Sequence, residues 1–259
     1  AMRLGIISDI HENLEMLERA LKLADFHKCD EMVCLGDIVG FDKRFYRHEP
    51  KRSASSCVRM VRRNCRWVVP GNHDVFAAGR LPEYTNGFDY PSDWFTMDPA
   101  VRKKISRGKV WCYGEDLPND LTEDDIMYLR ELPEFIATSD PHAACLFSHY
   151  IYPDLTGSTT RYVEKNHQLK GLWEFMNKQE VRYSFSGHSH TVFAGFAFKK
   201  DLSRLGSYLK AIHSIHSSMF RLGSETVMVL LPALAGEKGK TGFTVFDTND
   251  LTLNIVLIN

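Results

Sequence analysis

The chain has 259 residues, 44% of them hydrophobic and 25% charged, and a formal net charge of -1. This composition allows a large buried core and lacks the basic excess that is typical of nucleic-acid-binding proteins. The sequence shows no secretory signal pattern, no apolar run near the ~18 residues that span a bilayer, and no C-x-x-C pair among its 6 cysteines. We therefore expect a cytoplasmic protein with reduced thiols and no membrane insertion.

The first third of the chain alternates between two kinds of apolar pattern. Short apolar runs predict buried strands, whereas apolar residues at helical spacing, as in 13-NLEMLERALKLA-24 with Asn13 as its cap, predict amphipathic helices. The predicted elements are strands at 3–8, 31–37 and 66–74 and helices at 13–24 and 52–63. This order predicts right-handed crossovers between parallel strands.

The rest of the chain starts with an irregular stretch and becomes mostly strand-like. Residues 76–132 are rich in Pro, Gly and Asp and are predicted to be an insertion, which ends in a helix capped by Thr122. The later predicted elements are that helix at 122–132, two strands within 133–149, a helix at 167–179, and strands at 181–187, 192–198, 225–231, 242–247 and 251–258. Since no repeat or linker divides the sequence, we expect residues 1–259 to form a single domain.

Polar side chains follow five of the predicted strands at the point where each strand ends. They are Asp9 and His11, then Asp37, then Asn72 with His73 and Asp74, then His149, and finally His188 with His190. Sites in open α/β sheets form beyond the carboxyl ends of the strands, so these groups converge if their strands share a sheet. Each has an ordinary structural alternative, such as a helix cap for Asp9 or a turn position for Asn72. Their joint occurrence favours one shared site.

The five blocks resemble the calcineurin-like metallophosphoesterase superfamily. Its blocks are D-x-H, G-D, G-N-H-D/E, a lone His after a strand, and G-H-x-H. Here they read 9-DIH-11, 36-GD-37, 71-GNHD-74, His149 and 187-GHSH-190. The resemblance spans residues 3–192 and implies an α/β fold, a four-layer α/β/β/α sandwich of two mixed sheets flanked by helices. The strands after Gly195 would build the second sheet, and the metals would lie at one end.

The resemblance also implies a role for each polar residue of the blocks. One metal ion is expected on Asp9, His11 and His190, a second on Asn72, His149 and His188, with Asp37 bridging the two. The mixed N and O donors suit two divalent transition-metal ions, which are Mn, Fe, Zn, Ni or Co. His73 would protonate the leaving group or stabilise charge on the phosphate, and Asp74 would orient His73.

The implied activity is hydrolysis of a small phosphorylated substrate, a phosphomonoester or a phosphodiester, by in-line attack of metal-bound hydroxide. Two alternatives stay open at this point: a catalytically silent binding scaffold on the same fold, and a nuclease. The complete ligand set and His73 favour the enzyme over the scaffold, and the near-neutral charge argues against the nuclease and against nucleic-acid partners. Association into a homo-oligomer is left open.

The segment after Asp37 separates branches of the superfamily. The sequence 36-GDIVGF-41 resembles small archaeal and bacterial phosphoesterases and lacks the V-D-R-G or V-N-R-G of the Ser/Thr protein phosphatases and their bacterial relatives. The next residues, 42-DKRFYRHEP-50, depart from the Gly/Pro-rich segment of those small proteins. Two interpretations, phosphate contact and surface charge, fit its basic residues, which are Lys43, Arg44, Arg47 and His48.

The insertion is the predicted specificity element. Its aromatic residues within a short reach are Tyr84, Phe88, Tyr90, Trp94 and Phe95. Such residues stack on a base or an aryl group in some sites. They equally form satellite hydrophobic clusters under long loops, or dimer contacts, and the sequence favours this second interpretation.

Overall fold

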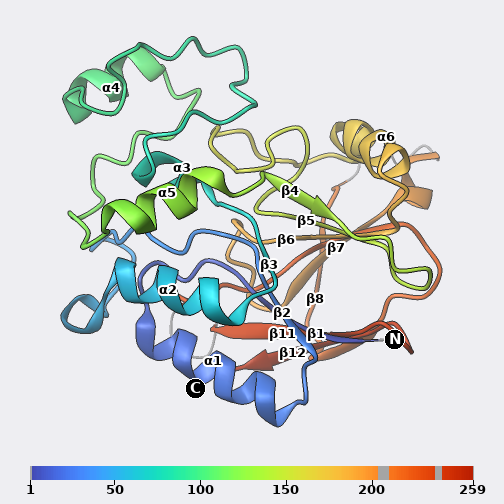
Figure 1. The fold of residues 1–259 in the computed structure, drawn as a ribbon. Helices are drawn as coiled ribbons and strands as arrows, with labels where there is room; N and C mark the ends of the chain where they lie inside the picture. Colours follow the sequence, from blue (N-terminus) through green and yellow to red (C-terminus); the bar gives the residue numbers. More distant parts are fainter. Residues whose placement is uncertain (1, 204–209, 237–240, 259) are drawn as a thin grey trace.

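Two stacked β-sheets form the centre of the computed structural model, which describes residues 2–203, 210–236 and 241–258 (Figure 1). In spatial order, the first sheet contains β3 (Trp67–Val68), β2 (Glu31–Cys34), β1 (Arg3–Ile7), β11 (Gly242–Asp247), β12 (Thr252–Leu257) and β9 (Met219–Arg221). The second contains β4 (Phe135–Ala137), β5 (Cys145–Ser148), β6 (Tyr183–Ser186), β10 (Val227–Leu230), β7 (Ala194–Phe198) and β8 (His213–Ile215). Both sheets are mixed: β1 is parallel to β2 and antiparallel to β11, and β10 is parallel to β6 and antiparallel to β7.

Helices cover the outer faces of both sheets. The helices of the described residues are α1 (Leu14–Phe26), α2 (Ala54–Asn64), α3 (Asn72–Ala77), α4 (Pro99–Ser106), α5 (Glu123–Glu131) and α6 (Lys170–Lys178), with the 3₁₀ turns η1 (Glu49–Lys51), η2 (Asn166–Leu169) and η3 (Lys199–Ser203). In Figure 1, α1 and α2 lie on the outer side of the first sheet, and α6 lies against the second. The predicted four-layer α/β/β/α sandwich is confirmed.

The alternation of side chains along β1 supplies two cores from one apolar run. Leu4 and Ile6 are buried between the sheets, where they join Phe147 of the second sheet. Ile7 belongs to the core on the other face, together with Leu17 of α1. Because successive strand side chains point to opposite faces, a short apolar strand is buried on both sides.

A third core lies between the second sheet and α6. Trp173 and Met176 of α6 are buried there with Leu146 of β5 and Met228 of β10. Burying side chains of this size contributes about 1.5–3 kcal/mol each to folding. The sandwich therefore has three apolar layers that hold its helices and sheets in place, and the loops at the strand ends are supported by them.

The predicted helices of the first half are confirmed with small shifts of their ends. Asn13 caps α1 by accepting a hydrogen bond from the backbone N–H of Met16 at 3.2 Å. Ser53 caps α2. Thr122 and Asp125 form a reciprocal capping box at the start of α5, as the acidic first turn indicates.

Two expectations about the strands need correction. The strand predicted at 66–74 is only β3, because the chain turns beyond it and enters α3, a helix too short to show a helical apolar period. The late strands do not all build the second sheet, since β11 and β12 lie beside β1 in the first. An apolar pattern indicates that a strand is buried but not which strand it pairs with, and the three-residue strands β8 and β9 have no such pattern.

The insertion expected at 76–132 contains α4 and α5, and Figure 1 shows α4 set apart from both sheets. Phe88, Tyr90 and Trp94 pack on one another with ring centroids between 4.8 and 5.4 Å apart, and Trp94 is 2% exposed. These three rings form a satellite hydrophobic cluster, in agreement with the interpretation that the sequence favours. Phe95 lies outside this trio and lines a cavity beside the candidate site.

In the described part of the chain, no helix combines the length and the apolar character that crossing a membrane requires. The six cysteines are all unpaired. Cys34 and Cys145 are buried within strands, where they pack as small hydrophobic residues.

Candidate metal centre

The carboxyl ends of strands from both sheets meet at one edge of the sandwich. β1, β2 and β3 run parallel in the first sheet, and β5 and β6 run parallel in the second. Nδ1 of His149, after β5, lies 2.7 Å from the backbone oxygen of Leu35, after β2. The backbone N–H of His188, after β6, donates to Oδ2 of Asp9 at 3.0 Å. The predicted convergence occurs, but between two stacked sheets rather than within one.

Five of the predicted ligands share an unusual backbone conformation. Their φ angles are 54° at Asp9, 45° at His11, 50° at Asp37, 63° at His188 and 46° at His190. Residues other than glycine are uncommon in this left-handed region, and each one costs on the order of 1–3 kcal/mol of folding free energy. Strain of this kind persists where the surrounding structure over-determines the conformation, and it is common at functional sites. Five of the twelve non-glycine residues with positive φ in the described part of the chain are predicted ligands.

Asp9, His11 and His190 form a first group, whose ligand atoms all lie within 4.8 Å of one another. Oδ1 of Asp9 lies 3.2 Å from Nε2 of His190 and 3.9 Å from Nε2 of His11. The other carboxylate oxygen accepts a hydrogen bond of 2.6 Å from the hydroxyl of Ser8. The structure thus brings together the three residues expected to hold one ion.

Asp37, His149 and His188 form a second group of the same compactness. Oδ2 of Asp37 lies 3.1 Å from Nε2 of His149 and 3.8 Å from Nε2 of His11, which belongs to the first group. Nδ1 of His188 lies 3.3 Å from Nε2 of His149. The Asp37 carboxylate therefore stands between the two groups.

Backbone carbonyl groups orient two of the imidazoles. A carbonyl oxygen can only accept, so Nδ1 of His11 donates to Gly40 at 2.7 Å, and Nδ1 of His149 donates to Leu35. Burial lowers the pKa of His11 to about 4, and burial together with the neighbouring His149 lowers the pKa of His188 to about 3. Neutral imidazoles with a free ring nitrogen are the form that binds metal.

The two carboxylates keep their negative charge despite complete burial. Burial raises the pKa of Asp37, but His149 and His73 outweigh it and hold that pKa well below its usual range. Burial also raises the pKa of Asp9, but the neighbouring His190 outweighs burial and lowers that pKa. Burial lowers the pKa of His149, but these two carboxylates outweigh burial and raise that pKa to about 9. A cation bound here at neutral pH displaces that proton.

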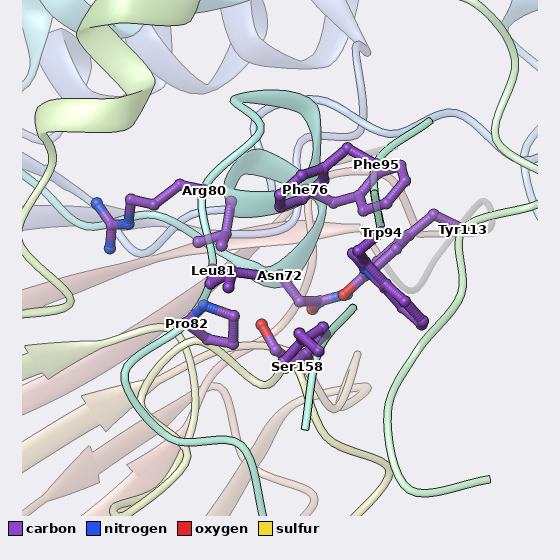
Figure 2. Close-up of a pocket in the computed structure, with 11 residues that line it drawn as sticks. Asn72, Phe76, Arg80, Leu81, Pro82, Trp94, Phe95, Tyr113 and Ser158 are labelled. Atoms are coloured by element: carbon purple, nitrogen blue, oxygen red, sulfur yellow. The ribbon is translucent and has the colours of Figure 1, made fainter. Parts of the chain in front are cut away.

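Three buried donor atoms test whether these residues fit a metal. Oδ1 of Asp9, Nε2 of His11 and Oδ1 of Asn72 have no hydrogen-bond partner within the described part of the chain. Buried polar atoms are nearly always partnered, so two such atoms 3.9 Å apart, Oδ1 of Asp9 and Nε2 of His11, indicate a missing ligand. Figure 2 shows Asn72 directed toward Tyr113 and Trp94 of the insertion. The oxygen and nitrogen donors present fit a divalent transition-metal ion.

His73 adjoins the groups from the start of α3. Its backbone N–H donates to Oδ1 of Asp37 at 2.9 Å, and its Nδ1 lies 2.6 Å from Oδ2 of Asp116. Burial lowers the pKa of His73, but Asp116 and Asp37 outweigh it and raise the pKa to about 10. His73 also lies close enough to His11 and Asp37 to form a third compact group of ligand atoms with them.

Asp116 is a site residue that the sequence analysis missed. It lies in a loop of the insertion between α4 and α5, where a single Asp gives no signal by spacing or by pattern. The family resemblance implies that Asp74 orients His73, whereas in the structure Asp116 contacts the His73 ring. The Asp74 carboxylate accepts hydrogen bonds from the backbone N–H groups of Ile38, Val39 and Gly71 at 2.9–3.0 Å. Asp74 therefore holds the loop of Ile38 and Val39 against the loop of Gly71.

Tyr46 is a second residue that the sequence analysis missed. Its ring stacks on the imidazole of His11 with centroids 4.6 Å apart and lies 6.4 Å from the ring of His190. Nε2 of His48 donates to the backbone oxygen of His11 at 2.8 Å. The segment at 42–50 thus packs over the first group through an aromatic ring and a histidine.

The basic residues of the same segment are engaged with neighbouring groups. Lys43 pairs with Glu49 at 3.1 Å, and Arg44 pairs with Asp42 at 2.7 Å. Arg47 donates to backbone carbonyl groups and is exposed. These contacts favour the surface-charge interpretation of the segment over phosphate contact.

Comparison with known proteins gives the class. Residues 2–192 match the calcineurin-like phosphoesterase family, so the chain belongs to that family of phosphoester hydrolases. A curated relative, the uncharacterized protein MJ0912 of Methanocaldococcus jannaschii, is 23% identical over 270 residues, covering 98% of this chain and 86% of that protein.

Solved structures show the same fold. A metallophosphoesterase from Sphaerobacter thermophilus superimposes with a TM-score of 0.66 at 22% identity, over 100% of this chain and 89% of that one. The hypothetical protein PH1004 from Pyrococcus horikoshii superimposes with a TM-score of 0.57 at 12% identity, over 100% and 88%. At these identities the likeness concerns the fold, in which two mixed sheets are flanked by helices.

Proposed function

We propose that this protein is a phosphoesterase that uses two divalent transition-metal ions to hydrolyse a small phosphomonoester or phosphodiester. The single observation that carries the proposal is a pair of buried donor atoms 3.9 Å apart, Asp9 Oδ1 and His11 Nε2, neither of which has a hydrogen-bond partner among the described residues. Membership of the calcineurin-like phosphoesterase family gives the reaction class. In this proposal residues 1–259 act as one domain, with the insertion at about 76–132.

Seven side chains would hold the ions. The proposed ligands of one ion are Asp9, His11 and His190, those of the second are Asn72, His149 and His188, and Asp37 is proposed to bridge them. When bound, two such ions supply positive charge to phosphate oxygens and favour the deprotonated form of water at neutral pH. The ring nitrogens of His11 and His149 are pre-oriented for this task by their backbone carbonyl partners.

His73 is proposed to act on the substrate. Its Nδ1 is held by Asp116, so Nε2 is the ring nitrogen left to meet a substrate oxygen. The carboxylates of Asp116 and Asp37 favour the protonated imidazole, which donates a proton to the leaving-group oxygen or stabilises phosphate charge. The proposed role of Asp74 is to hold the loops that carry Asp37 and His73.

The test is hydrolysis of p-nitrophenyl phosphate and bis(p-nitrophenyl) phosphate, measured in parallel after chelation and again with Mn added back. Activity that depends on metal and falls about 100-fold or more in His73→Ala is the expected result. The ratio of the two rates separates monoesterase from diesterase. Absence of turnover with every divalent metal, in a protein that binds two ions, would contradict the proposal in favour of a binding scaffold.

A further inference from the structure

A cavity of about 270 Å³ adjoins the candidate metal centre on the side of His73. His73 and Asp116 line one side of it, and Phe76, Phe95 and Arg102 line it from α3 and the insertion. Cavities of this size accept small organic groups, typically against apolar walls with a few polar anchors. This cavity has aromatic walls, and its charged groups are Arg102 and the His73–Asp116 pair.

Within the described part of the chain, Arg102 of α4 is a buried cation with no acidic partner in contact. The residue is 5% exposed, and its Nε and Nη1 atoms are buried without a hydrogen-bond acceptor among the residues that the structure describes. Its guanidinium lies 4.8 Å from the ring centroid of Phe76 and 6.0 Å from that of Trp94. Buried arginines are almost always paired, so an unpaired one stacked on aromatic rings beside a cavity indicates a site for an anion.

The acidic groups nearest to Arg102 are already engaged. Asp98 caps α4 by accepting hydrogen bonds from the N–H groups of Ala100 and Val101. Asp116 is paired with His73. Burial lowers the pKa of Arg102, with Cys112, Asp98 and Asp116 opposing it, but an arginine stays charged in proteins. No acidic side chain of the described residues therefore neutralises Arg102, whose positive charge lies beside the cavity.

We propose that the cavity binds the leaving group of the substrate, and that this leaving group carries a second anionic group, a carboxylate or a phosphate, bound by Arg102. The inference rests on the proposed function, in which His73 faces the leaving-group oxygen. His73 lines the cavity, so a leaving group whose oxygen meets His73 can extend into it. The guanidinium offers the planar, paired donors that suit carboxylate and phosphate.

The experiment compares three esters on the metal-loaded protein: phenyl phosphate, para-carboxyphenyl phosphate and hydroquinone bisphosphate. The variants are Arg102→Met and, as a matched control on the same helix, Lys104→Met, whose side chain is exposed. In the wild type, kcat/KM is higher for a charged ester than for phenyl phosphate. In Arg102→Met this preference falls about 10- to 100-fold, the value of a hydrogen-bonded charge contact, and in Lys104→Met it is unchanged. The two charged esters distinguish carboxylate from phosphate.

If Arg102 has only a structural role, the experiment gives a different result. Replacing a buried unpaired charge by an apolar side chain leaves the Tm unchanged or raises it, so Arg102→Met is expected to fold. A lowered Tm with an unchanged preference would overturn the inference and make Arg102 a clamp for Phe76 and Trp94. A wild type without preference for either charged ester would overturn it as well.

A binding measurement keeps this inference separate from the proposed function. If none of the esters is hydrolysed, the affinity of para-carboxyphenyl phosphate is measured by calorimetry for the wild type and Arg102→Met. Absence of turnover contradicts the proposed function. Equal affinities of the two proteins contradict the role of Arg102, and tighter binding to the wild type supports that role.

Discussion

Nδ1 of His73 and Oδ2 of Asp116 lie 2.6 Å apart, although 43 positions of the chain separate the two residues. His73 starts the helix after β3, and Asp116 belongs to the insertion. The insertion thus returns to the strand-end cluster and orients an imidazole whose own backbone contacts Asp37. Through this contact, a loop that lies outside the sandwich becomes part of the candidate site.

Replacing Asp116 by Asn tests this contact. Burial lowers the pKa of His73, and Asp116 and Asp37 raise it to about 10, so removal of the Asp116 charge lowers that pKa. Protonated His73 is then lost at lower pH, and the alkaline limb of the kcat/KM profile moves to lower pH. We expect Asp116→Asn to reduce kcat/KM by about 100-fold at neutral pH or above. Asp89→Asn, an exposed carboxylate of the same insertion, is the control, and an identical pH profile for all three proteins would contradict the prediction.

Metal content distinguishes the bridging carboxylate from a ligand of one ion. Asp37 stands between the two groups of donors, whereas His190 belongs to one of them. We expect about two ions per chain in the wild type, loss of both in Asp37→Asn, and loss of about one in His190→Ala. Elemental analysis after dialysis measures this, with His142→Ala as an exposed control. Equal losses in Asp37→Asn and His190→Ala would show that Asp37 does not bridge.

Asp125 is expected to make stability depend on pH. Burial raises its pKa, but hydrogen bonds from Ser55 and Thr122 outweigh it, so the pKa is lowered. A lowered pKa stabilises the folded state above the unfolded value of about 3.9, and this contribution is lost as the pH falls through the folded value. Asp125→Asn should cost ~1 kcal/mol in the free energy of unfolding at pH 7, because it removes part of a capping box.

Denaturant unfolding of Asp125→Asn and the wild type at neutral and acidic pH measures this effect. The difference between the two proteins should shrink as the pH falls below about 4. Asp124→Asn is the matched control, since Asp124 is exposed and its pair with Arg62 lies at the surface. A difference that is constant with pH would refute the assignment to the Asp125 charge.

Gly36 is expected to be intolerant of a side chain. Its φ is +94°, and an added Cβ would lie 2.6 Å from the carbonyl carbon of Pro70 and 2.8 Å from the Cα of Gly71. Gly87 has a φ of +67° with nothing within 4 Å of an added Cβ, so it isolates the backbone effect. Gly87→Ala should cost ~1 kcal/mol, and Gly36→Ala about 2–4 kcal/mol, in urea unfolding. Equal costs would mean that the close approach of the loops that carry Gly36 and Gly71 does not contribute to the stability of the folded state.

The sequence predicts the layers of this fold better than the pairing of its strands. The apolar run at 3–8 and the helical spacing at 13–24 indicate β1 and α1, because burial on two faces and on one stripe leaves distinct patterns. The positions of β11 and β12 beside β1 depend on contacts between residues far apart in the chain. No local pattern records such contacts.

The candidate site divides in the same way. The predicted ligands follow strands in short blocks, so their spacing is visible in the sequence. Asp116 and Tyr46 lie in loops without pattern and reach His73 and His11 only through the fold. Asp116 rather than Asp74 contacts the His73 ring, and backbone N–H groups donate to both carboxylate oxygens of Asp74.

The most direct test of the central claim is a crystal structure of the protein grown with Mn²⁺, with an anomalous difference map calculated for the metal. Two strong peaks are expected on either side of the Asp37 carboxylate, one near Asp9, His11 and His190 and the other near Asn72, His149 and His188. A map without peaks at this edge of the sandwich, or with metal bound only elsewhere, would contradict it.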